Sequence, residues 1–261
     1  LLVSTLLVLL SGCVRAGLGP AQSARGRGGA QALAEIDRLA GEEEKLQTAY
    51  DQAIALVAEA RQAGDDGLLT RALVKAVQLR SGLHGYETAV RFLREEEWPR
   101  GAESRAILDL FYGQALVHYQ ENYSWEIQQR ERVVGTEAVD LKQWTSRQIA
   151  EEAVKAFTRV YGLREGLGAT PVGSWSEFLK PNNYPAEVRG TLRDAVTYLL
   201  ADVLADSSLW SPEESNGVWR LDLAALLGEA PPAVDLEDAA VHPLSKLARV
   251  LADLQSWHRA Q

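Results

Sequence analysis

The feature that most constrains the fold is the spacing of apolar residues, which recur at intervals of three and four along most of the chain from residue 31 onward. Because an α-helix has 3.6 residues per turn, this spacing places successive apolar side chains on one helix face. No segment shows the sustained two-residue alternation that is typical of a half-buried strand. The sequence therefore predicts an all-α fold.

Glycine, proline and capping residues divide this pattern into separate helices. The apolar positions of the expected helices span 46–60, 69–79, 86–93, 107–119, 149–161, 192–204 and 244–254. The fourth helix is expected to continue past Trp125. We expect Asp140 or Thr145 to cap the start of the fifth helix, and Pro185 to occupy the first turn of the sixth. Short connections predict antiparallel helix pairs that form a tetratricopeptide-like solenoid or an irregular bundle, although the sequence has no fixed repeat period.

The first ten residues are almost wholly apolar and stop at Leu10-Ser11-Gly12-Cys13. Such a run is too short to cross a bilayer, but it fits the apolar region of a signal peptide, and small residues before Cys13 suit a signal peptidase. The four residues resemble a bacterial lipobox, in which the cysteine thiol receives a diacylglyceryl group. We therefore predict a signal peptide over residues 1–12 and lipidation of Cys13, in preference to an ordinary signal peptide or a buried helix.

The lipobox and the residues after it predict the location and the domain organisation. The residue after the cysteine is Val14 and not Asp, the residue that would keep a lipoprotein from being sorted to the outer membrane. In a Gram-negative cell, this predicts an anchor on the periplasmic side of the outer membrane. Residues 13–30 are rich in Gly and Ala and are expected to form a flexible tether. A helical domain is expected over residues 31–223, followed by a Pro-containing linker and terminal helix over residues 224–261.

Composition and residue types exclude several function classes. Hydrophobic residues make up 46% of the chain, which argues against disorder, and the net charge of -9 argues against nucleic acid as a partner. Cys13 is the only cysteine, so no thiol is left for a disulfide or a thiolate metal site. The four histidines are too scattered for a zinc motif: they are His84, His118, His242 and His258. We expect neither a metal nor a cofactor.

One enzyme class needs separate consideration, because helical lipoproteins include lytic transglycosylases. The pair Glu103-Ser104 resembles their catalytic Glu-Ser pair, and a buried Glu with a raised pKa acts as a general acid in such enzymes. The accompanying Gly-Leu-Met-Gln stretch is missing, and a Glu beside a Ser before an apolar run is typical of a helix start. The sequence therefore predicts no catalytic residue.

Aromatic residues suggest where a partner protein would dock. The seven tryptophans fall mostly near expected helix ends or in loops, where they either fill gaps between helices, the interpretation we favour, or form a contact surface. The long connection over residues 162–185 is the best candidate for a docking loop, because long structured loops often carry function. Its candidate residues are Trp175, Phe178, Asn182 and Asn183.

Three stretches resemble the N-terminal helical region of large bacterial alpha-2-macroglobulin-like lipoproteins. The first is Ala106–Leu108 leading to Tyr119–Asn122 and Trp125. The second is Asp140–Trp144 followed by Ile149 and Tyr161, and the third is Arg189–Asp194. The resemblance covers most of residues 35–223.

This resemblance implies part of a protease-trap protein, a protease inhibitor in which cleavage of a bait segment closes an array of macroglobulin domains around the protease. The chain would be a fragment or truncated product, with those β-rich domains lying beyond Gln261. Its own role would be that of a non-catalytic, membrane-anchored spacer and docking domain, with the membrane and the downstream macroglobulin domains as partners. The alternative is a free-standing tetratricopeptide-like lipoprotein that scaffolds other envelope proteins.

Overall fold

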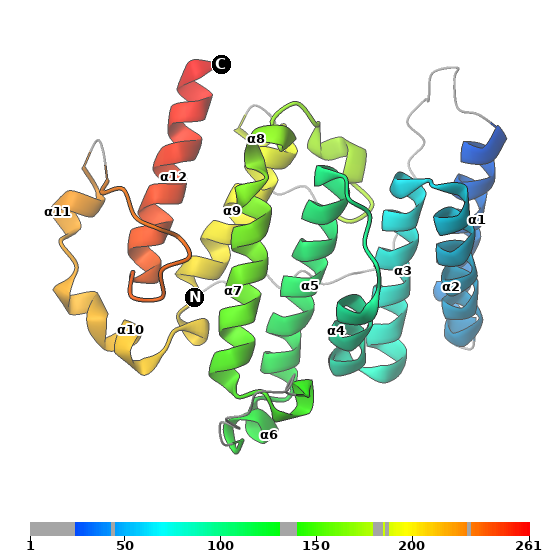
Figure 1. Cartoon of the computed structure of the whole chain (residues 1–261), viewed down its shortest axis with the longest axis horizontal. Coiled ribbons are helices and arrows are strands. Elements are labelled where there is room, and N and C mark those ends of the chain that lie inside the picture. The colour runs from blue at the N-terminus through cyan, green and yellow to red at the C-terminus, as the bar shows by residue number, and fades with distance from the viewer. Residues whose placement is uncertain (1–23, 43–44, 131–139, 180–184, 186–187, 229–230) are drawn as a thin grey trace. The chain divides into compact units, whose positions relative to one another are not determined.

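The helices expected from the apolar spacing are present in the computed structural model of the chain, which Figure 1 shows. The structure describes all residues except 1–23, 43–44, 131–139, 180–184, 186–187 and 229–230. The described residues form helices, turns and one isolated antiparallel bridge between Pro171 and Thr191, with no strand. The prediction of an all-α fold is confirmed.

The helices group into two units that divide at the start of α5, between Ser104 and Arg105. The N-terminal unit contains α1 (Ala24–Ala40), α2 (Leu46–Ala63), α3 (Asp66–His84) and α4 (Tyr86–Glu95). The main helices of the C-terminal unit are α5 (Ala102–Asn122), α6 (Ser124–Gln128), α7 (Ser146–Gly162), α8 (Arg164–Leu167), α9 (Leu192–Ala205), α10 (Pro212–Gly217), α11 (Leu223–Leu226) and α12 (Pro243–Ala260). Short 3₁₀ turns join them at η2 (Leu141–Gln143), η3 (Val172–Trp175), η5 (Ser207–Leu209) and η6 (Val218–Arg220).

In the N-terminal unit, a two-residue turn joins α2 to α3 as an antiparallel pair. Gly64 ends α2 with a φ of 64°, a left-handed conformation that glycine adopts without steric cost, and its N–H donates to the Ala60 carbonyl. The next residue, Asp65, begins α3 by accepting a hydrogen bond from the Leu68 N–H at 2.9 Å. Helices α1 to α4 then each pack against their neighbour in the chain.

Helix α1 begins earlier than the sequence predicts, because residues 24–30 are helical and are not part of a tether. Gly29 is buried, and a Cβ placed on it would lie 2.8 Å from the Cδ2 atom of Leu68 in α3. A glycine-rich sequence is a poor helix former by itself. The missing Cβ permits this close packing, so the contact made by Gly29 outweighs its low helix propensity. The rest of the tether predicted over residues 13–30, namely residues 13–23, lies outside the described residues.

In the C-terminal unit, side-chain caps fix where α7 and α9 begin. Thr145 precedes α7 and forms a reciprocal capping box, in which its N–H donates to Gln148 Oε1 at 2.9 Å. Asp140, the other predicted cap, instead caps η2 through a hydrogen bond from the Lys142 N–H at 2.8 Å. Thr191 caps α9 with Asp194 as its partner, so the prediction that Pro185 lies in the first turn of that helix is wrong.

Replacing Thr145 with alanine should lower the free energy of unfolding of the C-terminal unit by about 1 kcal/mol, because the Gln148 N–H in the first turn of α7 loses the Thr145 hydroxyl that accepts its hydrogen bond. Urea denaturation followed by circular dichroism measures the change. The matched control is Ser146→Ala at the next position, whose hydroxyl is not part of the capping box and whose loss should cost less than about 0.5 kcal/mol. Equal effects of the two variants would contradict the assignment of the cap.

Two further expectations for this unit need correction. Helix α5 does not continue past Trp125, because it ends at Asn122 and the chain turns at Tyr123 into the short helix α6. A non-helical segment with Pro231 and Pro232 does precede the terminal helix, as predicted. However, α12 packs along α9 and belongs to the same unit as the helices before it. The predicted domain boundary at residue 223 is therefore wrong.

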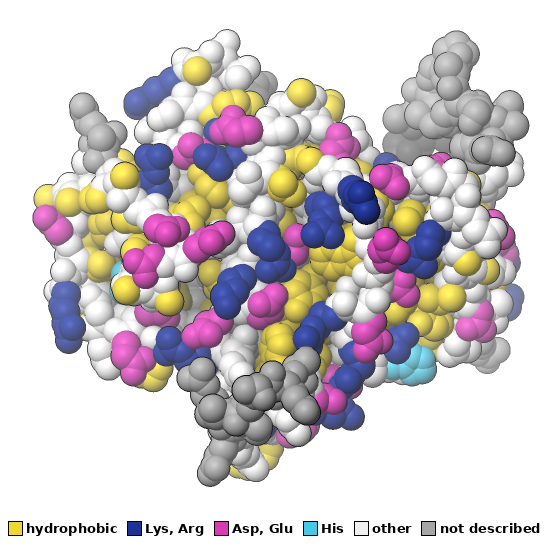
Figure 2. All heavy atoms as spheres, viewed as in Figure 1, with side chains coloured by type: hydrophobic (Ala, Val, Ile, Leu, Met, Phe, Trp, Pro, Cys, Tyr) yellow, Lys and Arg dark blue, Asp and Glu magenta, His cyan; other side chains and the backbone are white. Residues whose placement is uncertain are grey.

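The exposed surface carries both signs of charge. Figure 2 shows Lys and Arg side chains interspersed with Asp and Glu side chains over the visible face. Among the described residues, no helix combines the length and the apolarity needed to cross a membrane.

Candidate functional site

The structure places the predicted docking residues in two groups. Trp175 and Phe178 are only 3% and 5% exposed, and Phe178 packs edge-on against Phe111 of α5 with 5.8 Å between ring centroids. They belong to the core of the C-terminal unit, so the prediction that they form a contact surface is wrong. Asn182 and Asn183, like the lipobox residues Leu10, Ser11, Gly12 and Cys13, lie outside the described residues.

The other tryptophans and the catalytic candidate differ in exposure. Trp175 fills the interior as expected for a gap-filling residue, but Trp125 and Trp219 are 79% and 91% exposed. Glu103 lies exposed in the first turn of α5. This position fits the interpretation of Glu103 as a helix-start residue and does not fit that of a buried general acid. In the part of the chain that the structure describes, no three His, Cys, Asp or Glu side chains come together as metal ligands.

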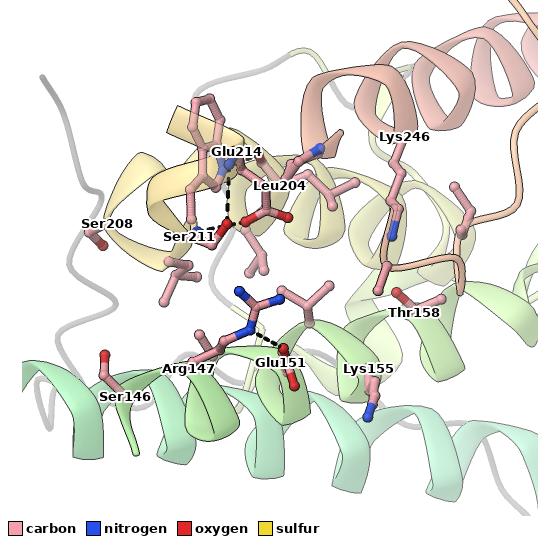
Figure 3. Close-up of a pocket in the computed structure, with 18 of the residues that line it drawn as sticks. Ser146, Arg147, Glu151, Lys155, Thr158, Leu204, Ser208, Ser211, Glu214 and Lys246 are labelled. Atoms are coloured by element: carbon pink, nitrogen blue, oxygen red, sulfur yellow. Dashed lines mark hydrogen bonds and ion pairs between the residues drawn. The ribbon is translucent and has the colours of Figure 1, made fainter. Parts of the chain in front are cut away.

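A candidate site is a cavity of about 610 Å³ in the C-terminal unit. Its walls come from α7, from the end of α9 and the η5 turn, from α10, and from the start of α12 (Figure 3). The apolar lining residues include Ala150, Val154, Val203, Leu204, Leu209, Trp210, Pro212, Leu236 and Pro243. A concave, mainly apolar space of this volume with a few polar groups is typical of small-ligand sites.

The arginines of this cavity are already engaged by carboxylates. Arg147 donates to Glu151 at 2.6 Å, which Figure 3 marks, and Arg159 donates to Asp109 at 2.7 Å. Glu214 accepts a hydrogen bond from the N–H of Ser211 at 2.6 Å and thereby completes the cap of α10. Each of these three groups therefore already has a partner within the protein.

Lys246 is the most deeply buried of the charged residues that line the cavity. It is 8% exposed, and its side chain extends from α12 toward the side of the cavity where Thr158 of α7 lies (Figure 3). No described residue forms a hydrogen bond or an ion pair with its ammonium group. Burial lowers the pKa of Lys246, and more distant carboxylates, with Glu214 the largest contributor, oppose this shift.

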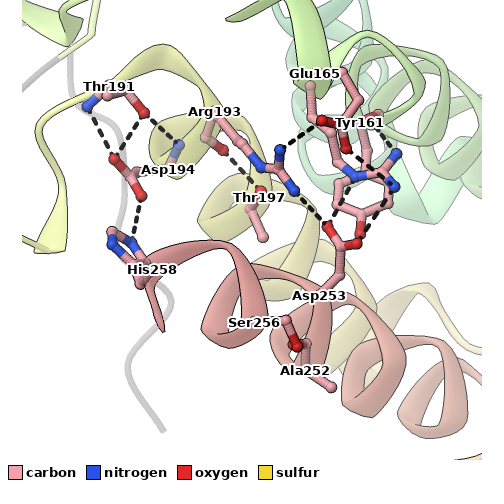
Figure 4. Close-up of polar contacts among 11 residues, drawn as sticks. Tyr161, Glu165, Thr191, Arg193, Asp194, Thr197, Ala252, Asp253, Ser256 and His258 are labelled. Carbon is pink, nitrogen blue, oxygen red and sulfur yellow. Dashed lines mark hydrogen bonds and ion pairs between the residues drawn. The ribbon is translucent and has the colours of Figure 1, made fainter. Parts of the chain in front are cut away.

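A second polar cluster joins α12 to α8 and α9 (Figure 4). Arg193 of α9 is 4% exposed and donates to Glu165 at 2.9 Å and to Asp253 of α12 at 3.0 Å. Arg164 donates to the same Asp253 at 2.8 Å, and the Arg193 guanidinium lies 4.9 Å from the ring centroid of Trp257. One carboxylate of α12 therefore holds two arginines from preceding elements.

Burial and hydrogen bonding act in opposite directions on this cluster. Burial raises the pKa of Asp253, but the hydrogen bonds from Arg164 and Tyr161 and the charges of both arginines outweigh it, so the net pKa is lowered. Burial raises the pKa of the Tyr161 phenol, which donates its hydrogen bond to Asp253. The cluster is thus held in its charged state at neutral pH and acts as a structural contact.

The start of α9 makes a further contact with α12. Asp194 is 1% exposed, and one of its oxygens accepts hydrogen bonds from Thr191 as part of the cap. The other oxygen lies 2.7 Å from Nε2 of His258 (Figure 4). Arg193 and Asp194 of α9 therefore both hold α12 in place.

Sequence reasoning missed both the cavity and the contact between α9 and α12. A signal for the contact existed, because Arg193 and Asp194 are adjacent charges inside an otherwise apolar helix pattern. A signal for Lys246 existed as well, because it precedes the buried Val250 and Leu254 by four and eight residues on one face of α12.

Comparisons with known protein families, with curated proteins and with solved structures found no match for this chain.

Proposed function

We propose that the protein is a lipid-anchored, non-catalytic helical docking module on the periplasmic side of a bacterial outer membrane. The observation that carries the proposal is the sequence Leu10-Ser11-Gly12-Cys13, in which the only cysteine of the chain follows an apolar run and two small residues. The all-α body adds support, because helical modules of this kind commonly hold protein partners through their surfaces. A lipid on Cys13 would keep this body at the membrane.

Within this role, the chain is the spacer and docking region of an alpha-2-macroglobulin-like protease-trap protein. The three stretches that resemble this family occur in the family's order after a lipobox. Arg189–Asp194, the last of them, provides the cap of α9 and its buried charges, a structural use that suits a spacer. The partners would be the downstream macroglobulin domains.

The N-terminal unit favours a second candidate, a tetratricopeptide-like lipoprotein that scaffolds an envelope complex. Its helices α1 to α4 pack against their sequence neighbours, as the helices of stacked helical pairs do. Genomic DNA downstream of the codon for Gln261 separates the two candidates. A reading frame that encodes β-rich repeats supports the protease trap, and a stop codon supports the scaffold.

Replacing Cys13 with alanine should abolish acylation, because no other thiol is present to receive the diacylglyceryl group. The chain is expressed in a Gram-negative host with a start codon and basic N-terminal residues, and radiolabelled palmitate incorporation is measured together with membrane fractionation. Burial of two or three acyl chains at about 0.8 kcal/mol per methylene makes the wild-type attachment effectively permanent. The variant should carry no label and should accumulate uncleaved.

The matched control is Ser11→Ala, which keeps a small residue before the cysteine and should be acylated like the wild type. Equal labelling of the wild type and Cys13→Ala would refute the lipid anchor. Labelled protein that fractionates with the inner membrane would refute the outer-membrane location alone.

A further inference from the structure

We propose that the cavity of the C-terminal unit binds a fatty-acid-like ligand, an unbranched apolar chain that ends in a single carboxylate. This proposal concerns a small molecule and does not rest on the docking function. It follows from the lining of the cavity, in which Lys246, a residue only 8% exposed, forms no ion pair with the described residues and most of the remaining surface is apolar.

The cation is the ammonium group of Lys246. Lys246 is 8% exposed as a residue, and this partial loss of water around its charged group lowers its pKa. No described residue forms an ion pair with it, whereas Arg147 and Arg159 in the same lining are paired at 2.6 Å and 2.7 Å. A ligand anion beside Lys246 would supply the missing partner.

The polar groups near Lys246 favour a weakly charged anion. Thr158 lies on the facing side of the cavity and offers a hydroxyl donor (Figure 3). Lys155, one turn earlier in α7, lines the cavity as an exposed residue and forms no ion pair with the described residues. These two groups and Lys246 can balance the single charge of a carboxylate.

Acidic residues around the same ammonium group argue against a phosphate. Glu214 and Glu237 line the cavity, and Glu214, Asp235 and Asp238 are close enough to act on the pKa of Lys246. A doubly charged phosphate would be repelled by these carboxylates more strongly than a monoanion. A ligand cation would be repelled by Lys246 itself.

The remaining walls suit an apolar chain. Val154 of α7, Leu204 of α9 and three further residues, Leu209, Trp210 and Leu236, give the cavity an apolar lining. The volume of about 610 Å³ lies within the range of about 300–1,000 Å³ that is typical of ligand pockets. A saturated chain would bury its methylenes against these apolar residues.

The test is isothermal titration calorimetry of dodecanoate into the full chain carrying Cys13→Ala, which removes the proposed lipid anchor. We expect saturable binding of one dodecanoate, at least tenfold tighter than that of dodecan-1-ol or dodecylamine. Affinity should rise about fourfold with each methylene from hexanoate to decanoate, because each buried methylene contributes about 0.8 kcal/mol. Titration without saturation, or equal affinities for the acid and the alcohol, would overturn the proposal.

The variant Lys246→Met keeps the length of the side chain and removes its charge. It should bind dodecanoate at least tenfold more weakly than the parent chain and bind dodecan-1-ol equally well. The matched control is Lys142→Met, an exposed lysine of η2 outside the cavity, which should bind like the parent. Equal weakening by both variants would show general charge attraction and overturn the site.

A second readout places the ligand independently of Lys246. Dodecanoate should change the tryptophan fluorescence of the parent chain, and Trp210→Phe should remove most of that change, because Trp210 lines the cavity. Full retention of the change in Trp210→Phe would place the ligand elsewhere and overturn the proposal.

Discussion

Replacing Asp253 with alanine should lower the free energy of unfolding of the C-terminal unit by about 3 kcal/mol, as expected when one partner of a buried ion pair is removed. The loss leaves Arg193, which is 4% exposed, without its carboxylate partner on α12 and removes the hydrogen bond from Arg164. Chemical denaturation of the wild type and the variant measures the change.

Glu165 provides the matched control, because it pairs with the same Arg193 at 2.9 Å but its side chain is 72% exposed. Glu165→Ala should cost less than about 1 kcal/mol, since solvent screens such a pair. Exchanging the pair for apolar residues, as Arg193→Met with Asp253→Leu, should recover much of the loss. If Asp253→Ala costs no more than Glu165→Ala, the cluster does not seat α12.

The same carboxylate should make stability depend on pH. The folded state lowers the pKa of Asp253, so its contribution is complete above the ordinary aspartate pKa and is lost as the pH falls through the lowered value. The difference in unfolding free energy between the wild type and Asp253→Asn should therefore shrink on acidification. A difference that grows at low pH would contradict the direction of the shift.

Replacing Gly113 with leucine should destabilise the C-terminal unit by about 3 kcal/mol, because the new side chain overfills the contact between α5 and α7. A Cβ at this position would lie 2.7 Å from Cε2 of Phe157 and 3.3 Å from the Cβ of Ala156, and Phe157 is only 2% exposed. Thermal or urea denaturation gives the change in stability.

The comparison variant is Gly162→Leu at the exposed end of α7, where a new Cβ would meet no atom within 4 Å. It should be neutral or stabilising, because glycine is a poor helix former. Equal destabilisation at both glycines would show that lost backbone freedom, and not the contact with Phe157, governs the effect.

Local signals explain which parts of the fold could be predicted. The capping box of Thr145 and the left-handed turn at Gly64 depend on neighbours within a few residues, so the sequence pattern indicates where α7 begins and α2 ends. The break at Tyr123 carries no such signal, since no glycine or proline marks it.

The parts that could not be predicted depend on contacts between distant segments. The burial of Trp175 and Phe178 follows from packing against α5, which the sequence of their own loop does not encode. Lys246 faces the cavity because α12 lies against α9, and the apolar spacing alone did not fix which side of α12 is buried. The candidate site therefore became visible only with the tertiary arrangement.

The seating of α12 on α9 also sets the order in which the chain acquires its structure during synthesis. The contacts of the N-terminal unit join consecutive helices, and such local contacts form quickly once those segments have emerged. In the C-terminal unit, Asp253 bonds to residues 60 and 89 positions earlier. Arg193 and Asp194 must wait for α12 to be translated, so the nascent C-terminal unit keeps an incomplete core, open to chaperones or proteases, until its last helix arrives.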